Sequence, residues 1–332
     1  MAQNVSHYAA RLRLEIGLRN RAYARDKAHV ESYGSFPVIV YAPEDDHHGN
    51  FQDGAYRAIL ARPEWLLRFD KVHAQASRSL PKAERRWREL DSCMSSDALL
   101  MNIFCFPGVS DSKAVQSLLG LHRAELPHFG WRARVPLAGG RSDRTEVDMR
   151  LGDLLVEAKL TEADFQSRAR AAVEAYRDFD EVFDRDLLPA AAIRSGRWRV
   201  ASEYPEDDSQ VVEDYEEARP AVLSREADGG RQALFEDGYA SYQLIRNVLA
   251  AHEHDCRFCM LHDARRPDLR EAWFRVMAAV RSAQMRTRMH VLTWQELAAV
   301  LPEPLQAFLD GKYGIVPPGK AASHVEGLDA WD

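Results

Sequence analysis

The sequence predicts an α/β protein, a three-layer sandwich in which helices cover both faces of a mixed central sheet. Residues 131–160 contain three segments in which apolar and polar residues alternate, which is the pattern of strands. The whole order is helix, three strands, helix, helix, strand, helix, strand, helix. Such an order combines antiparallel hairpins with crossover helices in one sheet. With 46% hydrophobic residues in 332, the chain has ample material for a core.

The first 90 residues (1–90) predict an N-terminal helical accessory region. A basic amphipathic helix is expected near residues 6–30, a strand at 36–42, a loop at 43–54 and further helix to about residue 90. These helices are rich in arginine, and we expect them to flank the functional site and contact phosphate groups. The pair His47-His48 is more typical of a loop feature than of a metal-ligand set, and a contact with substrate stays open.

Residues 91–160 predict the first half of the core. The segment "DSCMSSDALLMNIF" at 91–104 is typical of a helix with Ser or Asp at its N-cap, and a second helix is expected at 110–126. Strands are expected at 131–137, 144–151 and 153–160. The turn pair Gly152-Asp153 joins the last two strands into a hairpin.

The second half of the core continues from Thr161. A helix is expected to begin there, with Asp164 at capping-box spacing. Its apolar face would carry Phe165, Ala169, Val173, Tyr176 and Phe179. Further helices are expected at 238–254, 269–284 and 293–301, and strands at 256–263 and 288–293. We therefore assign the core to residues 91–302 and a C-terminal tail to 303–332.

An acidic segment interrupts this core. Residues 201–218 contain eight acids and no Lys or Arg, and they are expected to be part of a solvated loop insertion at 201–230. Without those eight acids the formal net charge of −7 would become +1, so the charge of the chain does not exclude DNA as a partner. An alternative stays open, in which the acidic arm occupies a cationic groove until nucleic acid displaces it.

Composition also restricts the class of protein. Four cysteines in 332 residues do not resemble a disulfide framework, and no charged-then-apolar leader precedes the first amphipathic helix. The longest apolar runs are far too short to span a bilayer. We expect a soluble cytoplasmic protein without a membrane partner.

The hairpin at 144–160 carries an unusual amount of charge. If Gly152 and Asp153 form the loop, counting back from the turn places Asp148 opposite Glu157, with β-carbons roughly 5 Å apart. By the period of two, Lys159 shares their face and lies opposite Glu146. The other face is apolar and is expected to point to the core; it carries Val147, Met149, Leu151, Leu154, Val156, Ala158 and Leu160.

Two like charges in directly opposed positions destabilise a sheet unless a cation lies between them. Mg²⁺ is a hard ion that binds one or two carboxylates together with water and substrate phosphate, which matches Asp148 and Glu157. Lys159 beside the ion could position or help deprotonate an attacking water. The alternative is a solvated sheet face on which Glu146 and Lys159 form an ordinary cross-strand ion pair.

The strand with Asp148, the turn, and the strand with "EAK" (157–159) resemble the PD-(D/E)xK nuclease superfamily, with Val147 where the superfamily name has Pro. The resemblance covers residues 91 to about 302 and implies a restriction-endonuclease-like fold and a metal-dependent phosphodiesterase that acts on DNA. It implies that Asp148, Glu157 and the Ala158 carbonyl bind metal and that Lys159 is catalytic. Two further residues are candidates by the same resemblance: Glu125, as an extra acid at the end of the first core helix, and Gln243, which would reach a water or phosphate from a later helix.

A competing zinc site is suggested by the segment at 252–263, which offers His252, His254, Cys256, Cys259 and His262. On a strand, Cys256 and Cys259 face opposite sides because they are three residues apart. The segment also lacks the tight turn that a zinc knuckle needs. We therefore expect both cysteines to be buried core residues.

We predict a Mg²⁺-dependent nuclease, with Mn²⁺ as an alternative ion, that hydrolyses DNA in restriction, defence or repair. One alternative is a catalytically inactive nucleic-acid-binding protein of the same fold. Another is a zinc-stabilised interaction protein with an acidic arm. DNA is the expected partner, and the sequence leaves a homodimer open.

Overall fold

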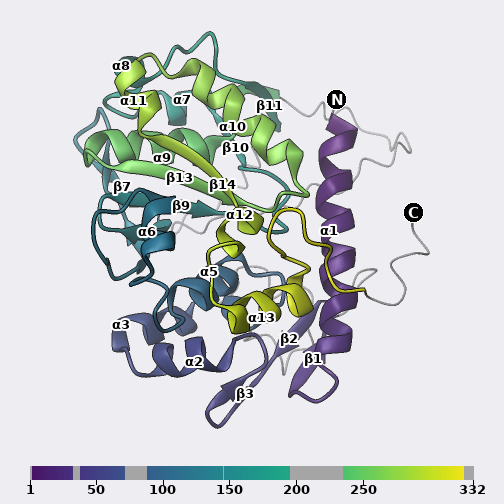
Figure 1. Ribbon diagram of the computed structural model, residues 1–332. Coiled ribbons are helices and arrows are strands. Elements are labelled where there is room, and N and C mark those ends of the chain that lie inside the picture. The colour runs from purple at the N-terminus through teal and green to yellow at the C-terminus, as the bar shows by residue number, and fades with distance from the viewer. Residues whose placement is uncertain (1, 33–37, 72–87, 145, 195–234, 325–332) are drawn as a thin grey trace, which may run out of the picture.

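The structure is a computed structural model that describes residues 2–32, 38–71, 88–144, 146–194 and 235–324 (Figure 1). The predicted acidic insertion, including residues 201–218, lies outside the described residues. Within the described ranges, no helix is both long enough and apolar enough to cross a membrane.

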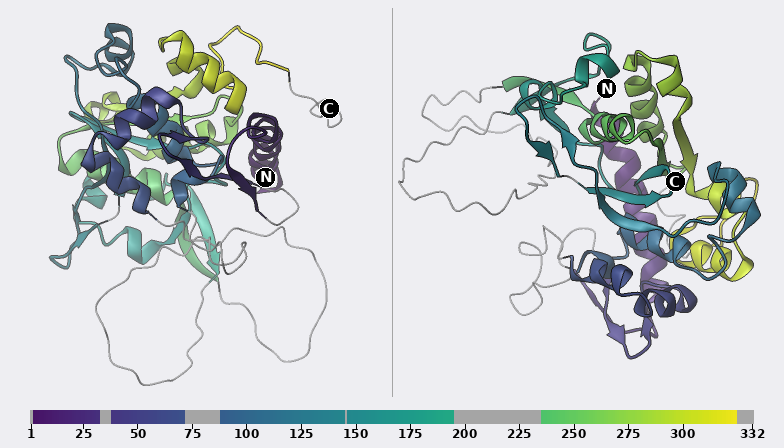
Figure 2. Two further views of the ribbon diagram at one scale, coloured as in Figure 1. Left: turned by 90° about the horizontal axis from the view of Figure 1, so that it is seen from below. Right: turned by 90° about the vertical axis from the view of Figure 1, so that its left-hand side faces the viewer.

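A five-stranded mixed sheet lies between layers of helices (Figures 1 and 2). In spatial order its strands are β14 (Met289–Thr293), β13 (Arg257–His262), β9 (Leu154–Ala158), β8 (Glu146–Leu151) and β5 (His128–Arg132). The strands β14, β13 and β9 run parallel, whereas β8 pairs antiparallel with both β9 and β5. The predicted α/β class and mixed central sheet are confirmed.

The hairpin between β8 and β9 has the predicted register. Leu151 pairs with Leu154, and Met149 pairs with Val156. Gly152 makes the turn possible because its φ of 62° lies in the left-handed region that favours glycine. The turn residues therefore position the strands as the sequence predicted.

Each face of the sheet has its own hydrophobic cluster. The first contains Met149, Val156 and Leu261 with residues of α1 (Ala2–Tyr23), α5 (Ser96–Phe104), α12 (Trp294–Ala298) and α13 (Glu303–Tyr313). The second contains Leu155 and Phe258 with residues of α9 (Tyr242–Glu253) and α10 (Pro267–Ala279). All five residues of β9 are buried. The hairpin is therefore covered on both faces, and the side that carries the charged residues is part of the interior.

The predicted apolar face of the hairpin is wrong at Val147. Val147 belongs to the second cluster with Leu155, although Met149, two residues later, belongs to the first. Residues two apart on a regular strand share a face, so the alternation is interrupted at Asp148. The pairing of β8 with β9 also ends at Met149 and Val156. The two strands thus separate at the position of the predicted metal ligand.

The helices around the sheet begin and end for local reasons. Ser95 caps α5, because its hydroxyl accepts a hydrogen bond from the Ala98 amide at 3.1 Å. The helix α6 (Lys113–Leu119) ends at Gly120, which has a φ of 65°. Thr293 and Glu296 form a capping box at the start of α12. Together with α9 and α10, these confirm most of the expected helices of the core, whereas α11 (Ala283–Thr287) is a separate short helix that the sequence did not predict.

The predicted helix from Thr161 is wrong. The segment instead forms β10 (Ser167–Ala169) and two single-turn helices, α7 (Arg170–Val173) and α8 (Phe179–Val182). The Asp164 carboxylate accepts from the Gln166 amide at 2.7 Å, and Gln166 has a φ of 60°. The carbonyl of Gln166 accepts from the Tyr242 amide, so it is not available for a helix. The strand β10 joins β12 (Phe235–Ala240) and β11 (Ala190–Arg194) in a three-stranded sheet.

Besides the long helix α1, the described part of the first 90 residues forms short elements, and several connecting strands are brief. These elements are β1 (His29–Glu31), β2 (Ile39–Tyr41), β3 (Pro43–Glu44), β4 (His47–His48), α2 (Asp53–Leu60), α3 (Pro63–Leu66) and the 3-10 helices η1 (Leu67–Asp70) and η2 (Glu89–Asp91). Between β5 and β8 lie β6 (Val135–Pro136) and β7 (Ser142–Asp143). A third cluster joins Phe51, Tyr56 and Phe69 to Ala98 and Met101 of α5.

The predicted division at residues 90 and 302 stays a prediction, but the first cluster crosses both positions. It contains Leu12 of α1, Leu100 of α5 and Leu309 of α13. Residues 303–313, which the sequence assigned to a tail, form the helix α13, which has one buried face, and α1 packs against it.

Candidate active site

Asp148 occupies the point at which β8 and β9 separate. Its Oδ2 accepts a hydrogen bond from the Ala158 amide at 2.8 Å. The carboxylate thus takes a donor of β9 that the continued ladder would have paired with backbone. Asp148 keeps part of its surface exposed. The interruption of the hairpin therefore aims one acid at the end of β9.

Glu157 and Lys159 are buried next to each other. Their side chains are 2% and 6% exposed, and Nζ of Lys159 lies 2.8 Å from Oε1 of Glu157. The other oxygen of Glu157, Oε2, accepts from Nδ2 of Asn247 at 2.6 Å. The alternative of a solvated sheet face is therefore wrong. The predicted pair of Glu146 with Lys159 is wrong as well, because Glu146 lies 2.7 Å from Arg68.

The charges of the site influence one another. Burial raises the pKa of Asp148 well above its usual value, and the nearby carboxylates of Glu157 and Asp97 raise it further. Burial alone would lower the pKa of Lys159, but the carboxylates of Glu157, Glu162 and Asp148 outweigh it, and the net shift is upward. The site thus holds an acid with an unfavourable negative charge and a firmly protonated amine.

The Ala158 carbonyl points to the same side as Asp148. Both backbone groups of a strand residue face the same neighbouring strand. Lys159 donates its amide to the Leu261 carbonyl of β13, so Ala158, one residue earlier, faces β8. Its amide confirms this direction by donating to Asp148. Asp148, Glu157 and Ala158 therefore offer three oxygen donors around the end of β9.

The helix α9 covers this site and supplies Asn247, which the sequence analysis missed. Asn247 is fully buried, and its Oδ1 accepts from the guanidinium of Arg246 at 3.0 Å. Gln243 is also buried and lies one turn earlier, so both amides share a face of α9. Arg246 in turn donates to the Glu146 carbonyl at 2.9 Å. The spacing of Gln243 and Asn247 is the signal that could have identified the second amide.

The structure does not bring Glu125 to this site. The helix that was expected to carry it ends at Leu119, and Glu125 lies in the following loop against the hairpin turn at Gly152. It pairs with Arg123 at 2.6 Å. Asp148 lies four residues before Gly152 along β8, a distance of roughly 13 Å.

Asp97 is an acid on α5 that sequence reasoning overlooked. It is buried and lies 2.6 Å from Arg68 and 3.6 Å from Lys71. Burial opposes ionisation, but these two cations outweigh it and lower the pKa of Asp97. In sequence Asp97 follows the N-cap Ser95, where an acid is explained by the helix dipole alone. Only the packing of α5 against the accessory region and the sheet indicates a further role.

The cysteines lie where the strand pattern predicted. Cys256, directly before β13, belongs to the second cluster and Cys259 of β13 to the first, so they are on opposite sides of the sheet. Both are free and buried. Across the described part of the chain, no three His, Cys, Asp or Glu side chains form a group that could hold a metal ion. One zinc ion between these cysteines would require a different fold of β13.

Comparison with known proteins identifies a family. Residues 18–314 match the profile of the family described as Restriction Endonuclease associating with ARP. No curated protein and no solved structure matches the chain. The matched range includes the whole central sheet and the residues around Asp148.

Proposed function

We propose that this chain, which belongs to the family of restriction endonucleases associating with ARP, is a PD-(D/E)xK nuclease. In this proposal it has a restriction-endonuclease-like fold and hydrolyses DNA phosphodiester bonds with Mg²⁺. The observation that carries the proposal is the convergence of Asp148, Glu157 and Lys159. All three come from one hairpin, and two of them form a buried ion pair at 2.8 Å. A solvated surface would not require such an arrangement.

The donor set fits a small, hard cation. Asp148, Glu157 and the Ala158 carbonyl offer only oxygen atoms, and Mg²⁺ binds oxygen while it keeps several waters. Each oxygen of Glu157 has one protein partner, which leaves further lone pairs. Burial and then the crowding of negative charge raise the pKa of Asp148, and a divalent cation would relieve that crowding. Mn²⁺ accepts the same kind of ligand. When bound, the cation would polarise a phosphoryl oxygen.

Lys159 acts in this proposal as a cationic hydrogen-bond donor. Because its pKa is raised, its ammonium group donates hydrogen bonds and does not serve as a base in the metal-free protein. It would hold the attacking water or a phosphoryl oxygen and stabilise the negative charge that develops in the transition state. Water adds to phosphorus and one ester P–O bond breaks, which leaves a phosphate and a hydroxyl end. Gln243 would position the same water or a phosphate oxygen from α9.

DNA is the proposed substrate. The proposed context is restriction, defence or repair in the cytoplasm. The accessory region contributes Arg68 and Lys71 beside Asp97, which agrees with the expectation that its basic residues flank the site. Binding to phosphate groups by basic residues should weaken as salt rises. The proposal of a homodimer rests on nothing further in the structure and stays a prediction.

An inactive DNA-binding protein of the same fold is the second candidate. Retention of Asp148, Glu157 and Lys159 together favours catalysis, since binding alone gives no chemical reason for all three. The zinc-stabilised alternative loses its basis because Cys256 and Cys259 lie in different clusters.

The test is cleavage of supercoiled, linear and single-stranded DNA by purified protein in Mg²⁺, Mn²⁺ or EDTA. We expect cleavage with either metal, none in EDTA, and loss of activity in Asp148→Ala and Glu157→Ala. Glu125→Ala is the matched control, because it removes a carboxylate that lies at the far end of the hairpin. Folded Asp148→Ala or Glu157→Ala protein that cleaves like the wild type would refute the proposal.

A further inference from the structure

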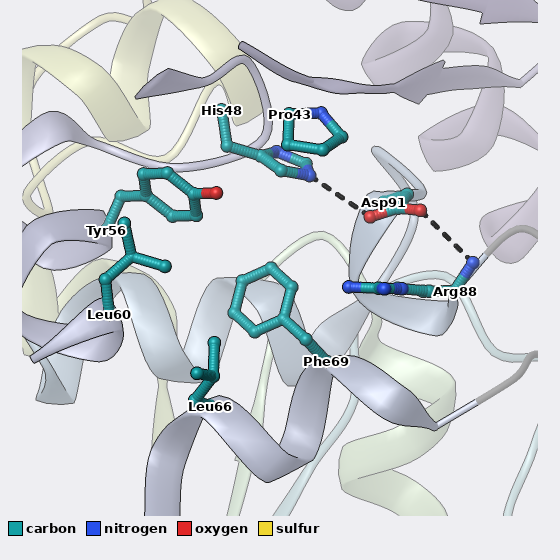
Figure 3. Close-up of a pocket in the computed structure, with 8 residues that line it drawn as sticks. All are labelled: Pro43, His48, Tyr56, Leu60, Leu66, Phe69, Arg88 and Asp91. Atoms are coloured by element: carbon teal, nitrogen blue, oxygen red, sulfur yellow. Dashed lines mark hydrogen bonds and ion pairs between the residues drawn. The ribbon is translucent and has the colours of Figure 1, made fainter. Parts of the chain in front are cut away.

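A pocket in the accessory region is separate from the acids of the hairpin (Figure 3). Its volume is about 330 Å³, and it is lined by Pro43, His48, Tyr56, Leu60, Leu66, Phe69, Arg88 and Asp91. Leu60 and Leu66 at its rim are 39% and 41% exposed, so the pocket opens to solvent beside exposed apolar side chains. Pockets that bind small molecules begin at roughly this volume.

Three aromatic rings form the walls of this pocket. The ring centres of His48 and Tyr56 are 5.5 Å apart, and those of Tyr56 and Phe69 are 6.0 Å apart. Figure 3 shows the Tyr56 hydroxyl directed toward the middle of the pocket. Burial and then the Asp91 carboxylate raise the pKa of Tyr56, so this hydroxyl is protonated and can donate. The pocket therefore combines aromatic surfaces with a hydroxyl group.

A carboxylate with a fixed orientation forms the polar wall. Nδ1 of His48 accepts from the Asn50 amide at 3.1 Å, so the proton of the neutral ring lies on Nε2. Nε2 donates to Oδ1 of Asp91 at 3.1 Å, and the Arg88 amide donates to Oδ2 at 3.1 Å. Each carboxylate oxygen keeps a further lone pair for a donor inside the pocket. Asp91 is therefore a preorganised acceptor.

The pocket shares two short elements with the candidate active site. In η1, Phe69 lines the pocket while the adjacent Arg68 contacts Asp97 and Glu146. In η2, Asp91 lines the pocket while Glu89 contacts Lys71 at 3.0 Å. Each element thus presents one residue to the pocket and another to the charged groups near Asp148.

We propose that this pocket binds one unstacked nucleobase that carries an exocyclic amino group, next to the site of cleavage. The proposal rests on the proposed function, because it takes DNA as the ligand. The base would stack on an aromatic ring, as extrahelical bases do in proteins that remove them from the duplex. Its amino group would donate to Asp91, so cytosine, adenine or guanine would be preferred to thymine.

The lining favours a base over a simple organic cation. Aromatic rings with a carboxylate can also hold an ammonium group, but Arg88 adds a positive charge to the same wall (Figure 3). The planes of Tyr56 and Phe69 make an angle of 62°, and those of His48 and Phe69 an angle of 68°. No parallel slot exists between these rings, so a base would stack on one ring and meet the others at its edge.

The test measures DNA binding in EDTA, where cleavage does not interfere. Fluorescence anisotropy would compare one duplex with an extrahelical cytosine, the same duplex with an abasic bulge, and the same duplex with an extrahelical thymine. We expect wild-type protein to bind the cytosine duplex at least about 5-fold more tightly than the abasic duplex. Thymine should fall between the two.

Variants separate the aromatic wall from the carboxylate. Tyr56→Leu should lower the ratio of cytosine to abasic affinity toward one, and Asp91→Asn should remove the preference for cytosine over thymine. Tyr8→Leu is the control, because Tyr8 is an exposed tyrosine on α1. Circular dichroism identifies any variant that fails to fold, and the other variant then decides the result.

Equal affinity of the wild type for the cytosine and abasic duplexes would overturn the proposal. So would an unchanged ratio in folded Tyr56→Leu or an unchanged thymine discrimination in folded Asp91→Asn. Absence of binding to all three duplexes would overturn it together with DNA as the substrate. By contrast, wild-type cleavage by Asp148→Ala would refute the proposed catalytic site and leave these binding ratios unaffected.

Discussion

Replacing Lys159 by Met removes the ammonium group and leaves Glu157 buried near Asp148. The side chains of the pair are 6% and 2% exposed, and their charged atoms are 2.8 Å apart. Removing one partner of a buried ion pair costs about 3–5 kcal/mol, because the remaining charge loses its compensation. Glu157 keeps the hydrogen bond from Asn247, so we expect the lower end, about 3 kcal/mol of the free energy of unfolding.

Urea unfolding in EDTA at pH 8 and pH 5 would measure this loss. The cost should be smaller at pH 5, because burial and then the neighbouring carboxylates raise the pKa of Asp148, and its protonation removes one negative charge next to Glu157. It should also fall when Mg²⁺ is added, if the cation binds these acids. Arg275→Met is the control, since the Arg275–Glu271 pair is exposed and should contribute less than about 0.5 kcal/mol. A cost for Lys159→Met below about 1 kcal/mol at pH 8 would contradict the buried pair.

Three further predictions follow from the buried polar groups. Asp148→Asn should raise the stability of the metal-free protein relative to wild type as pH rises from about 4 to 8. Because the folded-state pKa of Asp148 is raised, its contribution to the free energy of unfolding is present at low pH and is lost through that range. The absence of such a gain in pH-dependent unfolding in EDTA would count against this prediction. Arg68→Met should cost about 3–5 kcal/mol in urea unfolding, because Asp97 loses its closest cation; a near-neutral change would contradict this. Cys256→Ser and Cys259→Ser should each lower the free energy of unfolding by about 1–3 kcal/mol, because each buries a hydroxyl group. Stoichiometric zinc found in the wild type by mass spectrometry would contradict the assignment of both cysteines to the core.

The hairpin could be predicted from its turn as far as the pair Met149–Val156, because the determinants of that part are local, whereas the predicted pair Asp148–Glu157 lies beyond the point at which the strands separate. The turn at Gly152 and Asp153 fixes which residues of β8 and β9 are opposed, and counting from it gave the observed register. The opposite faces of Cys256 and Cys259 followed from the same period of two. Where pairing and alternation determine a position, a single sequence contains enough information.

The rest of the site depends on contacts between distant segments. Asn247 reaches Glu157 across 90 residues, and Asp97 meets Arg68 across 29. Neither contact has a local signature, since an amide on an amphipathic helix and an acid near an N-cap both have simpler explanations. The helix expected from Thr161 failed for the same reason. Its carbonyl at Gln166 is taken by the first amide of α9, a partner that lies far away in sequence.

The pair His47-His48 shows what a local pattern leaves out, because the loop expected at 43–54 contains the short paired strands β3 and β4. The two residues form a short strand, and adjacent strand residues point in opposite directions. His47 is exposed beside Asp46 and Asp53, whereas His48 is buried and bonded to Asp91. The sequence indicated a loop with an open contact role. It could not indicate that Asp91, 43 residues later, would complete the polar wall of a pocket.

The charges between the accessory region and the core argue that these parts act together. Arg68 contacts Asp97 of α5 and Glu146 of β8. Burial and Glu157 raise the pKa of Asp148, and the Asp97 carboxylate adds to this rise. Without Arg68, the carboxylates of Asp97, Glu146 and Asp148 would gather near the start of β8 with less positive charge to oppose them. A change in the position of η1 would therefore alter the electrostatics around Asp148 as well as the pocket formed by Phe69. For this reason the accessory region is better regarded as part of the site than as a separate module that delivers DNA to it.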